Sequence, residues 1–165
     1  MDRLYRLSLL LTADPELAEK CFVRGLEDSR TGNPVFKEWA RSWARRTIIT
    51  NAIRMVGPRP GVSQPVPQDV NGLPAELAAV LGLDPFDRFV FVMSVLEGYS
   101  DRDCKLLLDC SSSDIGQARA RALQHLADVA RAAGREEKTI QITPTTDDQA
   151  MTFAPVLRPH LAASV

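Results

Sequence analysis

Basic side chains recur through residues 36–54 (FKEWARSWARRTIITNAIR) at the spacing of a helix face. These basic residues are Lys37, Arg41, Arg45, Arg46 and Arg54. The first three are four residues apart, so a helix would place them on one face, with the last two around from it. Arginine and lysine displace counterions from phosphate, and the interleaved Trp39 and Trp43 supply aromatic rings. The segment predicts a nucleic-acid interface; a solvated basic face over buried tryptophans is the alternative.

A second stretch, LDCSSSDIGQARARAL at residues 108–123, combines a turn with polar side chains that suit DNA reading. Ser100 and Ser111 each precede a helical segment, and serine is a preferred helix cap. Two capped helices joined by a short turn form a helix-turn-helix, whose second helix can enter a major groove. The side chains predicted to reach DNA are Ser112, Ser113, Gln117, Arg119 and Arg121. Gln117 suits an adenine edge, and Arg121 suits phosphate or guanine.

No group of residues predicts catalysis or metal binding. His125 and His160 are isolated, and the chain has neither a supported Ser/His/Asp set nor a glycine-rich phosphate loop. Cys21, Cys104 and Cys110 lack the even count and paired spacing of disulfides or zinc sites, so we expect small packed side chains. The sequence therefore predicts a protein that is not an enzyme and has no cofactor or metal.

The overall charge excludes a broad electrostatic attraction to nucleic acid or acidic membranes. The 165 residues carry a net charge of −1, with 45% apolar and 25% charged residues, as in ordinary globular proteins. Any charge that binds DNA must therefore be local. The apolar run near the N-terminus is too short to span a bilayer and lacks a small-residue cleavage site after it. We expect a cytoplasmic protein without membrane insertion.

Helical periodicity dominates the elements that must position these residues, and an all-α fold is expected. In the first 56 residues, Thr12 or Asp14 can cap a helix whose first turn contains Pro15. A long helix is then predicted from Pro34 to near Val56, because the following GPRPG cannot continue it.

Proline and glycine divide the chain into two helical blocks. Residues 57–72 (GPRPGVSQPVPQDVNG) have the composition of a linker. Residues 1–56 and 73–134 are predicted to form two small helical domains, which the linker lets take separate orientations, and residues 135–165 a flexible tail. One helix is expected over residues 84–99. Core positions predicted for the second domain are Phe89, Val92, Met93, Leu96, Ile115, Ala118, Ala122 and Leu126.

Residues 87–103 (DRFVFVMSVLEGYSDRD), followed by the turn and the RARAL run of residues 119–123, resemble the C-terminal domain of a bacterial sigma factor. The resemblance is to the two-domain group called extracytoplasmic-function sigma factors. Residues 4–19 (LYRLSLLLTADPELAE) resemble the opening of the family's N-terminal domain. Residues 36–54 resemble its helix that engages and melts the minus-ten promoter element. The likeness covers roughly residues 4–129, in the family's order.

This resemblance implies core RNA polymerase and promoter DNA as partners, with an anti-sigma factor as a further one. By the same resemblance, Arg45, Arg46 and Arg54 would meet the promoter, while Trp39 and Trp43 would mainly pack. The function it implies is transcription initiation at selected promoters.

The chain departs from the family at two binding faces. The patch expected to dock on polymerase contains Glu19, Lys20, Val23 and Arg24. The family usually has acidic and glutamine side chains there, and reversed charge at a docking face weakens binding. In the predicted recognition helix, Gly116 and Ala118 replace the usual basic residues.

These departures leave three functions open. The first is a divergent sigma factor that directs polymerase to promoters. The second is a sigma-like interaction protein, a decoy or adaptor, that binds an anti-sigma factor or another regulator without initiating transcription. The third is a DNA-binding regulator that uses only the C-terminal motif.

Overall fold

The computed structural model is a succession of helices and describes residues 2–30, 40–63 and 73–140. At residues 2, 30, 40, 41 and 134–140 it describes the backbone alone. The elements are α1 (Asp2–Thr12), α2 (Pro15–Arg30), α3 (Ala40–Val56), α4 (Ala75–Leu81), α5 (Pro85–Phe91), the π-helix η1 (Val92–Leu96), α6 (Asp101–Leu108) and α7 (Ser112–Ile140). No strand occurs in these ranges, and the all-α prediction is confirmed.

Local chemistry sets the ends of the first helices as predicted. The Asp14 carboxylate accepts a backbone N–H of the first turn of α2 at 2.8 Å, and Pro15 is the first helical residue. The cap is therefore Asp14; the Thr12 hydroxyl instead donates to a carbonyl within α1. Helix α3 ends at Val56, and Gly57 follows with φ +61°, the left-handed conformation that ends many helices.

The segment expected to form one helix over residues 84–99 is instead two elements, α5 and η1. In η1 the Glu97 N–H bonds to the carbonyl of Val92, five residues earlier, at 2.9 Å. Because a π-turn contains more residues than an α-turn, it rotates the following side chains off the core face. Leu96 is accordingly 49% exposed, and its prediction as a core residue is wrong. The predicted core residues that are buried are Phe89, Val92, Met93, Ile115, Ala118 and Ala122, while Leu126 is half-buried.

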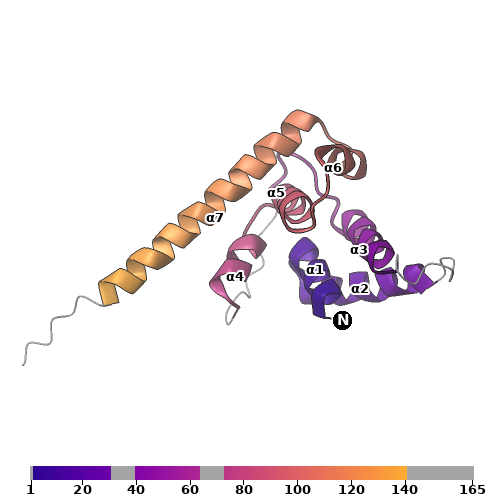
Figure 1. The fold of residues 1–165 in the computed structure, drawn as a ribbon, viewed down its shortest axis with the longest axis horizontal. Helices are drawn as coiled ribbons and strands as arrows, with labels where there is room; N and C mark the ends of the chain where they lie inside the picture. Colours follow the sequence, from indigo (N-terminus) through magenta and orange to yellow (C-terminus); the bar gives the residue numbers. More distant parts are fainter. Residues whose placement is uncertain (1, 31–39, 64–72, 141–165) are drawn as a thin grey trace, which may run out of the picture.

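Helix α7 is the longest element and extends past the core as a single arm (Figure 1). It continues six residues beyond Gly134, where the sequence predicted the helical domain to end. Residues 135–138 (REEK) are all good helix formers, so nothing stops the helix there. Residues 141–165, the rest of the predicted tail, lie outside the described residues.

The two predicted helical blocks pack against each other. Helices α1, α2 and α3 contact one another, and α5 contacts both α1 and α7 (Figure 1). One hydrophobic cluster includes Leu11 and Ile48 of the first block and Phe89 and Ile115 of the second. Gly25 allows α2 to approach α3 closely, because a Cβ there would lie 2.5 Å from the Ile48 side chain. The division into two domains joined by a linker stays a prediction.

A buried arginine joins the blocks. Arg88 of α5 is 4% exposed, and its guanidinium donates to the carbonyl of Leu11 at 3.4 Å from two of its nitrogens. It also donates to the carbonyls of Leu81 at 3.3 Å and Leu83 at 2.9 Å. Burial lowers the pKa of Arg88 to about 10, and the nearby Asp84 partly offsets this, so the side chain is charged at neutral pH. The Leu11 and Leu81 carbonyls lie at the C-terminal ends of α1 and α4, where the helix dipoles favour a cation.

We expect Arg88→Met to lower the free energy of unfolding by about 2–3 kcal/mol, because three buried carbonyls lose their donor. Urea denaturation followed by circular dichroism measures the change. Arg102→Met is the matched control, since Arg102 is exposed on α6 and should shift stability by no more than about 0.5 kcal/mol. Equal shifts for the two variants would contradict a structural role for Arg88.

Candidate nucleic-acid interface

The outward face of α3 combines an exposed tryptophan with basic side chains. Trp43 is 53% exposed, and Arg46 and Arg54, which follow three and eleven residues later, share its side of the helix and are exposed. The opposite side is buried and consists of Ala44, Ile48, Ile49 and Ala52. The expectation that Trp43 mainly packs is therefore wrong, because it lies off this buried face. This face therefore presents an aromatic ring and two guanidinium groups, which are side-chain types that bind single-stranded nucleic acid.

The other basic residues predicted on this helix are placed differently. Arg45 turns toward the second block, where its Nη1 lies 3.3 Å from the Glu97 carboxylate at the end of η1. Arg41 belongs to α3 by its backbone, and its side chain lies outside the description. Lys37 and Trp39 lie outside the described residues. The stripe of Lys37, Arg41 and Arg45 thus stays a prediction, and Arg45 is engaged within the protein.

Helices α6 and α7 are joined by a three-residue turn at the predicted position. Asp109 has φ +48°, a left-handed conformation that ends α6. Ser111 caps α7 by accepting the Asp114 N–H at 3.1 Å, and the Asp114 carboxylate accepts both the Ser111 N–H at 2.9 Å and its hydroxyl at 2.6 Å. These hydrogen bonds lower the pKa of Asp114 below its ordinary value. Ser100 caps α6, as predicted, by accepting the Asp103 N–H at 3.1 Å.

The first turns of α7 expose the neutral residues predicted to read bases. Ser112, Ser113 and Gln117 are exposed, and the Gln117 amide donates to the Ser113 hydroxyl at 3.2 Å. Gly116, in the same stretch, also borders open space. These three side chains share the exposed start of one helix, as the sequence predicted.

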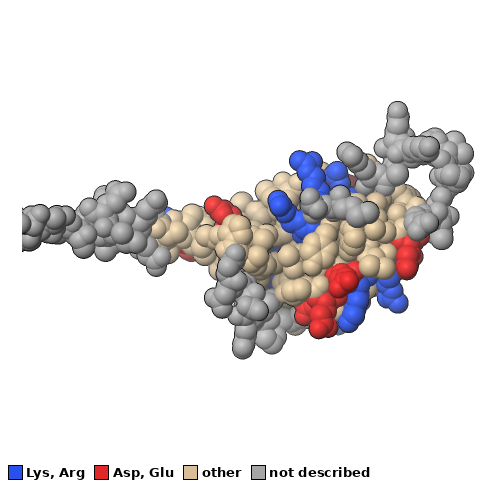
Figure 2. Space-filling model, turned by 90° about the horizontal axis from the view of Figure 1, so that it is seen from below, with Lys and Arg blue, Asp and Glu red and all other residues tan. Residues whose placement is uncertain are grey.

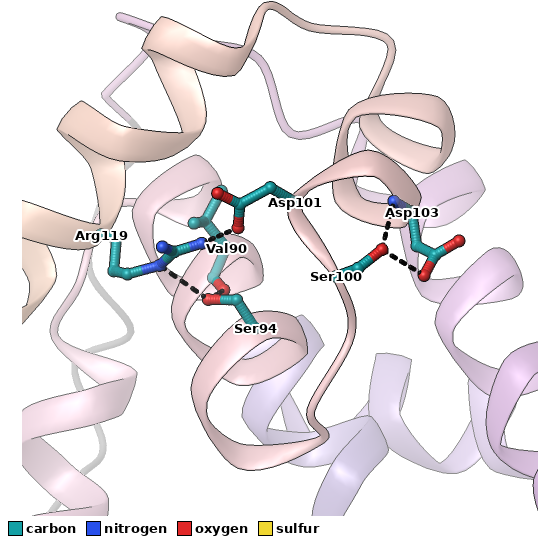
Figure 3. A network of polar contacts seen from close by, with 6 residues as sticks. All are labelled: Val90, Ser94, Ser100, Asp101, Asp103 and Arg119. Carbon is teal, nitrogen blue, oxygen red and sulfur yellow. Dashed lines mark hydrogen bonds and ion pairs between the residues drawn. The ribbon is translucent and has the colours of Figure 1, made fainter.

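The two arginines predicted further along α7 are bound by acidic groups of the same chain. Arg119 donates to the Ser94 hydroxyl at 3.2 Å and pairs with Asp101 at the start of α6 (Figure 3). Arg121 forms a two-pronged pair with Asp87 of α5, with Nε–Oδ2 and Nη2–Oδ1 distances of 2.8 and 2.7 Å. The Asp87 side chain is 8% exposed, and its hydrogen bond raises the pKa of Arg121. Both guanidinium groups are therefore paired within the fold, and any contact with DNA would have to compete with these ion pairs.

The surface near Arg121 is acidic. A pocket beside it is lined by Asp84, Asp87 and Asp114, together with residues 60–63, and the Ser63 hydroxyl donates to Asp84 at 2.6 Å. Carboxylates next to the predicted reading helix repel phosphate. On the face seen in Figure 2, basic side chains gather along one edge, acidic side chains with a few basic ones lie along the opposite edge, and uncharged surface lies between the two edges.

The four residues predicted to dock on polymerase lie together. Glu19, Lys20, Val23 and Arg24 line an open groove on α2, with Met55 of α3 forming its other side. Val23 is 44% exposed at this groove. Lys20 lies 3.8 Å from Glu16 in an exposed helical pair, which contributes little to stability. The face thus combines the apolar side chains of Val23 and Met55 with side chains of both charges.

The cysteines are packed side chains, as predicted. Cys21 and Cys104 are fully buried and Cys110 is half-buried, and all three are free thiols. Burial raises the pKa of Cys21 and of Cys104 to about 11, so neither is a ready nucleophile. Across the described residues, no cluster of three or more His, Cys, Asp or Glu side chains could hold a metal ion. None of the described helices is long and apolar enough to cross a bilayer.

Sequence reasoning missed the acidic partners that hold the predicted DNA-binding arginines. Asp87, Glu97 and Asp101 belong to the second block, 34, 52 and 18 residues from the arginines they bind. Helical spacing reveals partners three or four residues apart, but not partners on another helix. No pattern in the sequence indicates these three contacts.

No protein-family model, curated protein or solved structure matches the chain.

We expect Ser111→Ala to lower the free energy of unfolding by about 1 kcal/mol, because α7 loses its cap. Nuclear magnetic resonance titration should also show the pKa of Asp114 rising toward its ordinary value. Since folding lowers this pKa, the stabilisation from Asp114 is present above the ordinary carboxyl range and is lost as pH falls through the folded pKa. Ser113→Ala should change neither quantity, and an equal effect of both variants would contradict the capping assignment.

We expect Arg121→Gln to destabilise the protein by about 1–3 kcal/mol, because it leaves the buried Asp87 carboxylate without its paired donor. The same substitution two residues earlier, Arg119→Gln, removes a more exposed ion pair and should lower stability by at most about 1 kcal/mol. Urea denaturation of both variants measures the difference. A larger loss for Arg119→Gln would overturn the ranking.

Proposed function

We propose that this protein is a divergent extracytoplasmic-function-type sigma factor, which binds core RNA polymerase in the cytoplasm and directs initiation at selected promoters. The observation that carries the proposal is the outward face of α3, where exposed Trp43 lies with Arg46 and Arg54. Promoter melting needs a ring that can hold an unstacked base and cations that follow the strand. The resemblance places its promoter-melting helix on this same segment.

The arrangement of α6 and α7 supports the proposal through a second contact. Two capped helices with a three-residue turn place Ser112, Ser113 and Gln117 at an exposed helix start. Such a helix can contact base edges through neutral hydrogen-bonding groups. Arg119 and Arg121 are bound internally, so we assign the reading of the second promoter element to the three neutral residues.

A second function, a sigma-like interaction protein that does not initiate transcription, is favoured by one observation. Arg119 and Arg121 are held by Asp101 and Asp87, and Asp84 and Asp114 border the same helix. A recognition helix whose cations are neutralised has little nonspecific affinity for DNA. In that case the groove containing Val23 would bind a regulator in place of polymerase.

Competition for polymerase distinguishes these functions. We expect the full-length protein to be retained by immobilised core RNA polymerase and to be displaced by a typical sigma factor. Val23→Asp should weaken retention about tenfold or more, because it replaces an exposed apolar side chain of the docking face with a charge. Val62→Asp is the control, since Val62 is similarly exposed, at 50%, and lies outside that groove.

Three outcomes are informative. Loss of retention only with Val23→Asp supports the sigma-factor function and this docking face. Equal retention of both variants would refute the docking face but not polymerase binding. No retention of the unaltered protein at moderate salt would overturn the sigma-factor proposal and favour the interaction protein.

A further inference from the structure

An apolar groove lies between α1, α4 and α7, apart from the DNA-binding and polymerase-docking residues discussed above. It has a volume of about 920 Å³. Its apolar lining includes Leu77, Val80, Leu96, Leu126, Val129 and Ala130. Arg6 and Glu76 are the charged residues in its lining, and their opposite signs leave the groove with no net charge. A neutral apolar segment is therefore the kind of partner that it fits.

The groove is open because of two features of the fold. The π-turn places Leu96 half in solvent at one side, and α7 continues beyond the other helices at the other (Figure 1). Ala130 and Ala133 on α7 face this groove and are exposed. A large apolar surface of this kind usually marks a site of interaction.

The chain itself contains a segment of matching chemistry, directly after α7. Residues 141–150 (QITPTTDDQA) are mainly polar, whereas residues 151–161 (MTFAPVLRPHL) are mainly apolar and contain one fully charged residue, Arg158. A polar spacer thus precedes an apolar segment at the end of the same helix that forms one wall of the groove.

The spacer is long enough for this segment to return to the groove. Ala133 is seven residues and Leu126 fourteen residues before the end of α7, which is roughly 10 and 21 Å along a helix. Ten extended residues span at most about 35 Å. We infer that the groove between α1, α4 and α7 is an intramolecular docking site for residues 151–161 of the same chain. A short tether gives the segment a local concentration on the order of millimolar, so even weak apolar contacts suffice.

Paramagnetic relaxation in the full chain tests this inference. A nitroxide is attached at Ser164→Cys in a Cys110→Ser background, since Cys110 is the half-buried native thiol while Cys21 and Cys104 are buried. We expect strong broadening of the backbone amide signals of groove residues such as Leu77 and Ala130. Signals of α2 should be unaffected.

Two variants of α7 provide the control for side-chain chemistry. Ala130→Glu places a charge in the groove and should reduce the broadening at Leu77 at least threefold. Ala127→Glu adds the same charge at an exposed position of α7 outside the groove lining and should leave the broadening unchanged. Both positions are exposed, so neither variant removes core packing, and Ala133→Glu provides a second groove substitution.

The outcomes separate the occupants of the groove. Broadening that persists when dilute protein carrying both the nitroxide and the isotope is mixed with an excess of protein carrying neither supports docking within one chain. Broadening that appears only when the nitroxide and the isotope are on different copies would overturn it in favour of a second copy. Absence of broadening at the groove, or equal effects of the Ala127 and Ala130 variants, would also overturn it. The inference does not depend on the proposed function, because no readout uses polymerase or DNA.

Discussion

The buried guanidinium of Arg88 is the interaction on which the arrangement of the helices depends. A charge that leaves water is tolerated only when its donors are satisfied, and here backbone carbonyls at the ends of two helices supply the acceptors. Since Leu11 lies in the last turn of α1 and Leu81 is the last residue of α4, one side chain of α5 contacts the ends of two other helices. No buried side-chain nitrogen or oxygen in the described chain lacks a hydrogen-bond partner. The contact joins α5 of the second block to α1 of the first, and the two blocks also share one hydrophobic cluster.

The meeting of the blocks determines which cations remain available to a ligand. It brings the end of η1 against α3, where Glu97 takes up Arg45, while Arg46 on the other side of the helix stays exposed. On α7, Arg119 and Arg121 become connections to η1, α6 and α5. Among the predicted DNA-binding residues whose side chains the structure describes, Arg46 and Arg54 on α3 and the neutral residues at the start of α7 remain exposed.

The π-turn links this packing to the exposed surface. Its wider hydrogen-bond spacing keeps Val92 and Met93 in the core but turns Leu96 outward into the groove that α7 borders. The same turn positions Ser94, whose hydroxyl accepts from Arg119 and donates to the carbonyl of Val90 (Figure 3). One local irregularity therefore serves both the anchoring of α7 and the opening of an apolar surface.

By itself, the sequence determined the all-α class, the caps at Asp14, Ser100 and Ser111, the end of α3 and the exposed serines at the start of α7. These features depend on interactions within one or two helical turns, so residue spacing is enough to predict them. Only the tertiary structure decided that Arg121 binds Asp87, that Arg88 joins the blocks, and that the residues predicted to dock on polymerase share a groove with Met55 of α3. Such contacts join helices far apart in the chain, and their partners are selected by packing rather than by local sequence pattern.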